Sequence, residues 1–98
     1  MLYNKTTMAK IIIKMYATIR EKFKEEKVNI VASTVLEAVR KLVEEYPVLR
    51  DEVLDENLNL KNDYIYLLNG RNVEFLQKGD TPLKDGDKIS IFPPVAGG

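Results

Sequence analysis

The sequence has no cysteine, no histidine and no tryptophan among its 98 residues. Without cysteine, the chain has no disulfide, no thiolate nucleophile and no sulfur ligand for a metal. Without histidine, it lacks the commonest general base and the commonest metal ligand. Catalysis would then depend on carboxylates or lysines, and no pair of carboxylates stands out from an ordinary charged surface. We therefore expect neither a catalytic side chain nor a metal site.

The sequence also lacks an excess of charge and a long apolar run. Fifteen lysines and arginines balance fifteen aspartates and glutamates, so the formal net charge is zero. A basic excess would favour nucleic acid or anionic membrane as the main partner. The apolar runs are far shorter than the roughly 20 residues that span a bilayer, and residues 1–9 lack the apolar core of a secretory signal. We predict one cytoplasmic domain that binds neither nucleic acid nor membrane.

The first half of the sequence predicts a hairpin followed by a helix. Residues 10–16 and 27–31 alternate apolar and polar side chains, which is typical of strands, and a long connection joins them. Residues 34–46 carry apolar side chains at helical spacing. Thr34 and Glu37 fit a capping box at the start of this helix, with threonine as N-cap and glutamate at the third helical position.

The second half predicts a short helix and three more strands. The short helix is expected over 48–55, with its apolar side chains turned inward. Strands are expected over 63–68 and 71–74, on either side of Asn69-Gly70, a strong signal for a tight hairpin turn. The last strand is expected over 88–92.

This order of elements, with one helix after two strands and three strands behind it, is that of a β-grasp domain. We predict the α+β class, with a ubiquitin-like mixed sheet of about five strands packed on one main helix. The domain is expected to cover 9–92. Residues 1–8 would form an N-terminal extension that is disordered, and residues 93–98 a flexible tail.

The chain ends in two glycines behind two prolines: Pro93, Pro94, Val95, Ala96, Gly97 and Gly98. Glycine has no Cβ, so the last two residues could pass a narrow channel. Proline has a fixed φ and no N–H, so Pro93 and Pro94 would hold the tail extended and away from the sheet. Six extended residues span at most about 20 Å, enough to bring the Gly98 carboxylate into a partner's active site. Frayed termini are common, but this ordered series favours a functional tail.

Apolar residues are also expected on the solvent side of the sheet. If the two isoleucines of the last strand face the helix, then Lys88, Ser90 and Phe92 face solvent. The same alternation exposes Ile12 and Tyr16 on the first strand. Together with Phe92 they could form a patch that binds a partner. The alternative, that a loop or the N-terminal residues cover them, stays open.

Four segments together resemble the MoaD family, the small subunit of molybdopterin synthase within the ThiS/MoaD ubiquitin-like sulfur carriers. They are 16–21 (YATIRE), 68–71 (LNGR), 83–89 (LKDGDKI) and 92–98 (FPPVAGG). The resemblance covers roughly residues 9–98, and the ending is its most specific part. The chain is also similar to archaeal MoaD-related proteins, some of which double as protein modifiers.

The resemblance implies a chemistry for the tail. An adenylating enzyme of the ubiquitin-activating type (MoeB-like) would use ATP and Mg²⁺ to convert the carboxylate of Gly98 into an acyl adenylate. A sulfur donor protein would replace AMP and leave a thiocarboxylate. The loaded tail would then enter the large synthase subunit (MoaE-like) and give its sulfur to a pterin precursor, for a molybdenum or tungsten cofactor. In the family, two small and two large subunits form a heterotetramer.

The resemblance also assigns roles to other residues. Gly97, Ala96, Val95, Pro94 and Pro93 would thread into the partner, and the chain would bind no cofactor itself. Residues expected to bind the partner are Phe92, Ile12, Tyr16, Arg20 and Arg71.

Three other functions remain in competition. The chain could be a ubiquitin-like modifier joined through Gly98 to a target lysine, or a ThiS-like carrier for another pathway. The helical insert around 48–62 and the Phe-Pro-Pro sequence before the tail argue mildly against the ThiS branch. The last alternative is a passive β-grasp interaction module whose diglycine is accidental.

Overall fold

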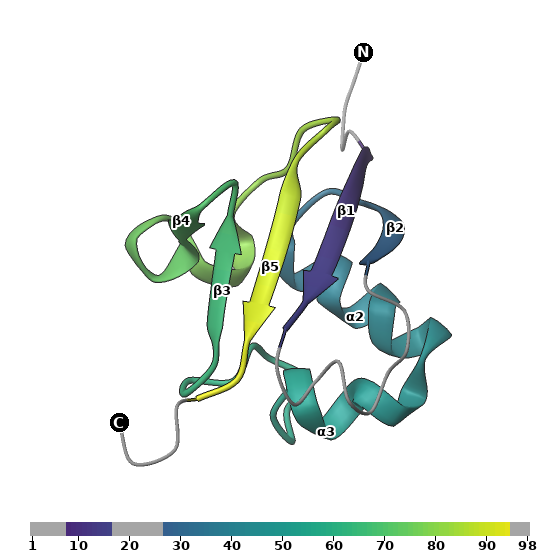
Figure 1. Ribbon diagram of the computed structural model, residues 1–98, viewed down its shortest axis with the longest axis vertical. Coiled ribbons are helices and arrows are strands. Elements are labelled where there is room, and N and C mark those ends of the chain that lie inside the picture. Colours follow the sequence, from purple (N-terminus) through teal and green to yellow (C-terminus); the bar gives the residue numbers. More distant parts are fainter. Residues whose placement is uncertain (1–7, 17–26, 95–98) are drawn as a thin grey trace.

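The computed structural model describes residues 8–16 and 27–94, which form a β-grasp domain (Figure 1). The strands are β1 (Ala9–Met15), β2 (Lys27–Ala32), β3 (Ile65–Leu68), β4 (Arg71–Asn72) and β5 (Lys88–Phe92). The helices are α2 (Val35–Glu45) and α3 (Arg50–Val53), with short 3-10 turns at η1 (Pro47–Leu49), η2 (Val73–Phe75) and η3 (Lys78–Asp80). None of these helices is long and apolar enough to cross a membrane. The predicted extension falls almost entirely outside the described residues.

The strands form one mixed sheet in the order β2-β1-β5-β3-β4. β1 pairs with β2 in the antiparallel sense and with β5 in the parallel sense. β3 is antiparallel to both β4 and β5. The predicted mixed five-stranded sheet is therefore confirmed, with the last strand of the chain at its centre. Helix α2 packs across one face of the sheet (Figure 1).

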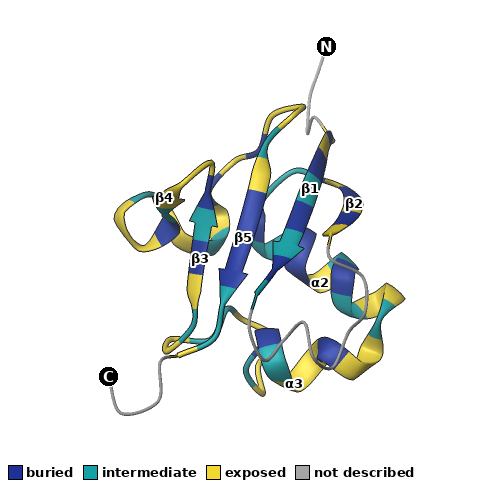
Figure 2. Ribbon diagram, viewed as in Figure 1, coloured by how far each residue is buried: buried dark blue, intermediate teal, exposed yellow. Residues whose placement is uncertain are grey.

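The core lies between α2 and the sheet. Alternate residues of β1 are buried, whereas β5 has an unbroken buried stretch over Ile89–Ile91 (Figure 2). The largest fully buried side chains are Ile13, Met15, Leu42, Leu49, Ile89, Ile91, Val35, Val39 and Val53. The set includes residues of η1 and α3, so the predicted short helix does turn its apolar side inward. These two short elements close the end of the core beyond α2.

Two strands are shorter than predicted. β3 begins at Ile65, and β4 ends at Asn72 because the chain turns there into η2. The side chain of Asn72 accepts a hydrogen bond from the amide of Glu74 at 2.9 Å, which caps this turn. The hairpin between β3 and β4 forms as predicted, with positive φ at Asn69 (52°) and Gly70 (87°). Two positive φ angles are what a type I′ turn requires.

The helix α2 is capped by Thr34, but the predicted capping box closes differently. The Thr34 hydroxyl accepts from the amide of Glu37 at 3.2 Å, as expected. The Glu37 carboxylate reaches one residue further back and accepts from the Ser33 amide at 2.6 Å and the Ser33 hydroxyl at 2.8 Å. These bonds, chiefly the one from the Ser33 amide, hold the pKa of Glu37 below its usual value, with a smaller contribution from Lys41.

The variant Glu37→Gln is expected to lower the free energy of unfolding by about 1 kcal/mol at pH 7, because a charge-assisted bond becomes a neutral one. The pKa of Glu37 is lower in the folded than in the unfolded chain, so its ionised form adds stability above about pH 4.5. That contribution disappears as the pH falls through the folded pKa. The free energy of unfolding measured with urea should therefore differ between wild type and Glu37→Gln at pH 7, and this difference should be smaller at pH 3. An equal difference at both pH values, or a similar loss in Glu44→Gln on the exposed side of α2, would contradict this assignment.

Candidate docking face and C-terminal tail

The face of the sheet opposite α2 has no described element over it, and we call it the outer face (Figure 1). The alternation of buried and exposed residues in the strands sets its members. They are Lys10, Ile12 and Lys14 of β1, Lys27, Asn29 and Val31 of β2, Ile65 and Leu67 of β3, and Lys88, Ser90 and Phe92 of β5. Tyr16, directly after β1, joins them through its contact with Phe92. The outer face thus includes three of the predicted partner-binding residues.

Tyr16 and Phe92 form an aromatic pair at one end of this face. Their rings stack with centroids 4.3 Å apart and planes 13° from parallel. The amide of Tyr16 donates to the carbonyl of Ile91 at 3.2 Å, which continues the pairing of β1 and β5 past the end of β1. Both rings are half-buried, as is Ile12. The prediction that these side chains lie on the open side of the sheet is right, but the two rings shield each other.

Two apolar neighbours of the aromatic pair were not predicted. Ile65 lies opposite Phe92 across the β3–β5 ladder and is 39% exposed. Leu67, on the same side of β3, lies opposite Ser90. We call Tyr16, Phe92, Ile65 and Leu67 the apolar patch. The alternation in β3 hints at these side chains, but the sequence does not show which residue of β5 each one meets.

Ser90 departs from its predicted exposure. Its position is on the outer face, yet only 7% of it is accessible to solvent. The residues beside it in the neighbouring strands are Lys14 and Leu67. Serine is short and lies here on the central strand, so the longer side chains on both sides cover it. The longer side chains of the neighbouring strands therefore cover the backbone and Ser90 at the centre of the outer face.

The tail leaves the domain beside the apolar patch. Pro93, half-buried, and Pro94, exposed, directly follow Phe92 at the end of β5. The predicted threading residues 95–98, including Gly97 and Gly98, lie outside the described part of the chain, and so does Arg20. The described residues thus place the start of the tail next to the apolar patch.

Arg71 is not brought to the apolar patch. It lies in β4 opposite Leu68, whose side chain is buried in the core. Cross-strand neighbours point to the same side of a sheet, so Arg71 projects toward the helix side. It lines a shallow depression there with Leu76 and Pro82.

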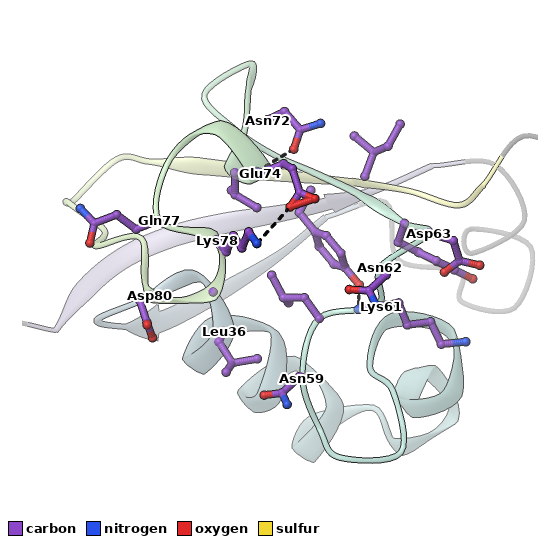
Figure 3. Close-up of a pocket in the computed structure, with 16 residues that line it drawn as sticks. Leu36, Asn59, Lys61, Asn62, Asp63, Asn72, Glu74, Gln77, Lys78 and Asp80 are labelled. Carbon is purple, nitrogen blue, oxygen red and sulfur yellow. Dashed lines mark hydrogen bonds and ion pairs between the residues drawn. The ribbon is translucent and has the colours of Figure 1, made fainter.

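A pocket of about 500 Å³ lies on the helix side, between α2, the loop before β3 and the η2–η3 segment (Figure 3). The Tyr66 hydroxyl donates to the carbonyl of Val53 at 2.7 Å and accepts from the amide of Lys61 at 3.1 Å. Burial raises the pKa of Tyr66, and burial together with Glu52 raises that of Tyr64 to about 12. Both phenols therefore stay protonated at neutral pH and act as structural donors.

No group of three or more carboxylate, histidine or cysteine side chains that could hold a metal occurs among residues 8–16 and 27–94. The features that remain for a function are the outer face and the tail that starts beside it.

The comparisons with known proteins agree with this geometry. The family model described as the ThiS family matches residues 13–98. Small archaeal modifier protein 3 of Haloferax volcanii is 41% identical over 66 residues, which cover 67% of this chain and 71% of that protein. The solution structure of small archaeal modifier protein 1 from Methanosarcina acetivorans has a TM-score of 0.83 and 32% identity, covering 93% of this chain and 98% of that one.

A chain from the complex of subunits 1 and 2 of the molybdopterin-converting factor of Helicobacter pylori is also similar. It has a TM-score of 0.59 and 30% identity, and the match covers 91% of this chain and 99% of that one. A family match over most of the chain, two small modifier proteins and a converting-factor complex converge on one group. The chain therefore belongs to the ThiS family, the ThiS/MoaD group of ubiquitin-like sulfur carriers and modifiers.

Proposed function

We propose that this protein is a sulfur carrier that acts as the small subunit of a molybdopterin synthase. Its C-terminal Gly98 carries the sulfur as a thiocarboxylate, and the protein contributes no catalytic side chain. The observation that supports this role best is the position of the tail, which starts beside the apolar patch at the end of the central strand. A partner that docks on the outer face receives the tail at the edge of the same contact.

The chemistry requires activation by another protein. A C-terminal carboxylate has a pKa of about 3.5, so it is ionised at neutral pH and is a poor acyl donor. An oxygen of the Gly98 carboxylate attacks the α-phosphorus of ATP in the adenylating enzyme, with Mg²⁺ bound to the nucleotide, and pyrophosphate leaves. A sulfur nucleophile delivered by a donor protein then attacks the acyl carbon and displaces AMP. None of these steps needs a histidine or cysteine of this chain, and the sequence has neither.

High-resolution mass spectrometry of protein isolated from its native host tests the proposal. Cleavage after Lys88 releases the fragment Ile89–Gly98, which contains no methionine, so oxidation cannot mimic the exchange of oxygen for sulfur. We expect a fraction of this fragment to carry a thiocarboxylate. A plain carboxylate in cells that contain the activating enzyme and assemble a molybdenum or tungsten cofactor would refute the sulfur-carrier role.

A second candidate is a ubiquitin-like modifier, and it is favoured by the names of two relatives, both small archaeal modifier proteins. It shares the adenylation of Gly98 but ends in an isopeptide bond to a lysine of a target protein. Remnants of Ile89–Gly98 on lysines of other proteins after trypsin digestion, in conjugates that resist thiols, would identify this role. The two roles share one activation step, so one protein could serve both.

The variant Phe92→Ala is expected to weaken binding to the large synthase subunit by about tenfold or more, because a buried aromatic anchor is a typical interface hot spot. Isothermal titration calorimetry with that subunit measures the effect. The control is Val48→Ala in η1, which removes a side chain that is 61% exposed and lies away from the outer face. Equal affinities of the two variants would show that the apolar patch is not part of the interface.

A further inference from the structure

The outer face concentrates positive charge in a protein whose formal net charge is zero. Among the outward positions of the described strands, four hold lysine and none holds aspartate or glutamate: Lys10, Lys14, Lys27 and Lys88. The ammonium of Lys14 lies 5.3 Å from the centre of the Tyr16 ring, beside the apolar patch. Lys10, Lys27 and Lys88 are exposed. The acidic residues of the described part of the chain thus lie outside these outward positions.

Two carboxylates beside Lys10 and Lys88, those of Asp85 and Asp87, are held in the turn before β5. Asp85 accepts from the amide of Lys10 at 2.8 Å. Asp87 accepts from the side chain of Asn69 at 2.8 Å and from the amide of Lys84 at 2.7 Å. These bonds hold the two carboxylates at the rim of the sheet. The outer face therefore presents Lys10 and Lys88 at the end away from the apolar patch, whereas the cross-strand pair Lys14 and Lys27 lies toward the patch.

From this arrangement we infer that the adenylating enzyme binds the outer face through an acidic surface opposite Lys10 and Lys88, and through an apolar site for Tyr16 and Phe92 at the other end of the face. The inference rests on the proposed function, which supplies the need for such an enzyme. The carboxylate of Gly98 has to approach the triphosphate of ATP, and these negative charges repel each other. Attraction between lysines and an acidic surface away from the nucleotide offsets that repulsion and speeds association.

The geometry places this acidic surface relative to the entrance for the tail. Lys88 lies four residues before Phe92 on β5, which is about 13 Å at 3.3 Å per residue. Lys10 lies two residues before Ile12, the neighbour of Lys88 in β1, and so further from the tail. The acidic side chains of the enzyme should thus begin about 13 Å from the mouth of the channel that takes the tail.

The test compares two double variants with the same change in net charge. Lys10→Glu with Lys88→Glu reverses charge on the outer face, and Lys78→Glu with Lys84→Glu reverses it on the turns outside that face. All four lysines are exposed, so the urea midpoints of both variants should stay close to wild type. Affinity for the adenylating enzyme of the same organism is measured with the full-length chain, by calorimetry at 50 and 300 mM NaCl.

We expect the outer-face variant to bind about tenfold more weakly or worse at 50 mM NaCl, with a smaller difference at 300 mM because salt screens the charges. The neutral pair Lys10→Gln and Lys88→Gln should fall between it and wild type. The control variant should bind within about twofold of wild type. Equal loss in the outer-face and control variants would show an effect of net charge alone and overturn the inference, as would no loss in either.

Two further results separate this inference from the proposed function. In the first, wild type binds in a salt-dependent way, the outer-face variant does not, and no acyl adenylate forms with ATP. This result would uphold the electrostatic contact and refute the proposed activation. If wild type forms the acyl adenylate, and the outer-face variant binds the enzyme and reacts as wild type does, the proposed activation is upheld and the electrostatic contact is refuted. A loss confined to binding of the large synthase subunit would overturn the choice of partner.

Discussion

Removal of Gly98 is expected to abolish sulfur transfer and leave the fold intact. The deletion leaves a terminal carboxylate on Gly97, one residue short of the adenylation site, and at most about 3.6 Å of lost reach exceeds the tolerance of a near-attack geometry. The core ends at Ile91, so the free energy of unfolding should stay within about 0.5 kcal/mol of wild type. ATP-dependent acyl-adenylate formation with the purified adenylating enzyme measures the loss, and urea unfolding measures the fold.

The matched variant Gly97→Ala keeps the length of the tail and adds one methyl group. If the channel is as narrow as a diglycine suggests, this change should slow adenylation strongly, again without a change in stability. Normal loading of Gly97→Ala would exclude threading through a narrow channel. Normal loading of the chain without Gly98 would show that the carboxylate of Gly97 serves equally well, and would contradict the requirement for the full length of the tail.

The variant Leu42→Ala is expected to lower the free energy of unfolding by about 2–5 kcal/mol, the largest effect on stability predicted here. Leu42 lies in α2, is fully buried and belongs to the core between helix and sheet. A small domain has little room to collapse around the cavity that the lost side chain leaves. The melting temperature should fall by roughly 10 °C or more for a domain of this length.

The control for Leu42→Ala is Glu45→Ala at the exposed end of the same helix, which should change the melting temperature by at most a few degrees. Differential scanning calorimetry provides both values. Equal melting temperatures for the two variants would mean that Leu42 is not part of the core. Well below its melting temperature, Leu42→Ala should still bind the large synthase subunit.

The class of the fold was predictable because it depends on local patterns. The alternation in β1, the helical spacing in α2 and the Asn69-Gly70 turn are each visible within about ten residues of sequence. What the sequence did not reveal are pairings over long distances. The stack of Tyr16 on Phe92 and the position of Ile65 opposite Phe92 depend on the register of three strands. A register set by packing in the core cannot be read from any one of them.

Three smaller errors also depend on neighbours that the local pattern does not show. Ser90 was expected to be exposed from the alternation in β5, but its burial depends on the length of the side chains in the strands on both sides. The Glu37 carboxylate was expected to reach the amide of the N-cap and instead bonds Ser33, because the chain before the helix brings two donors of Ser33 to one carboxylate oxygen. Arg71 shares a family position, yet its cross-strand partner Leu68 determines the side to which it points.

The position of β5 in the sheet has a consequence for how the chain is made. Synthesis proceeds from the N-terminus, so the hairpin of β1 and β2 and the hairpin of β3 and β4 both emerge before the strand that joins them. Until β5 enters between β1 and β3, the nascent chain has two separate ribbons and no complete core. A chain truncated before β5 cannot complete its sheet and core. A chain that does complete the sheet has been translated to Phe92, a few residues before the diglycine. Only a nearly complete chain can therefore fold, and shorter products, which stay unfolded, are open to proteolysis before they compete for the activating enzyme.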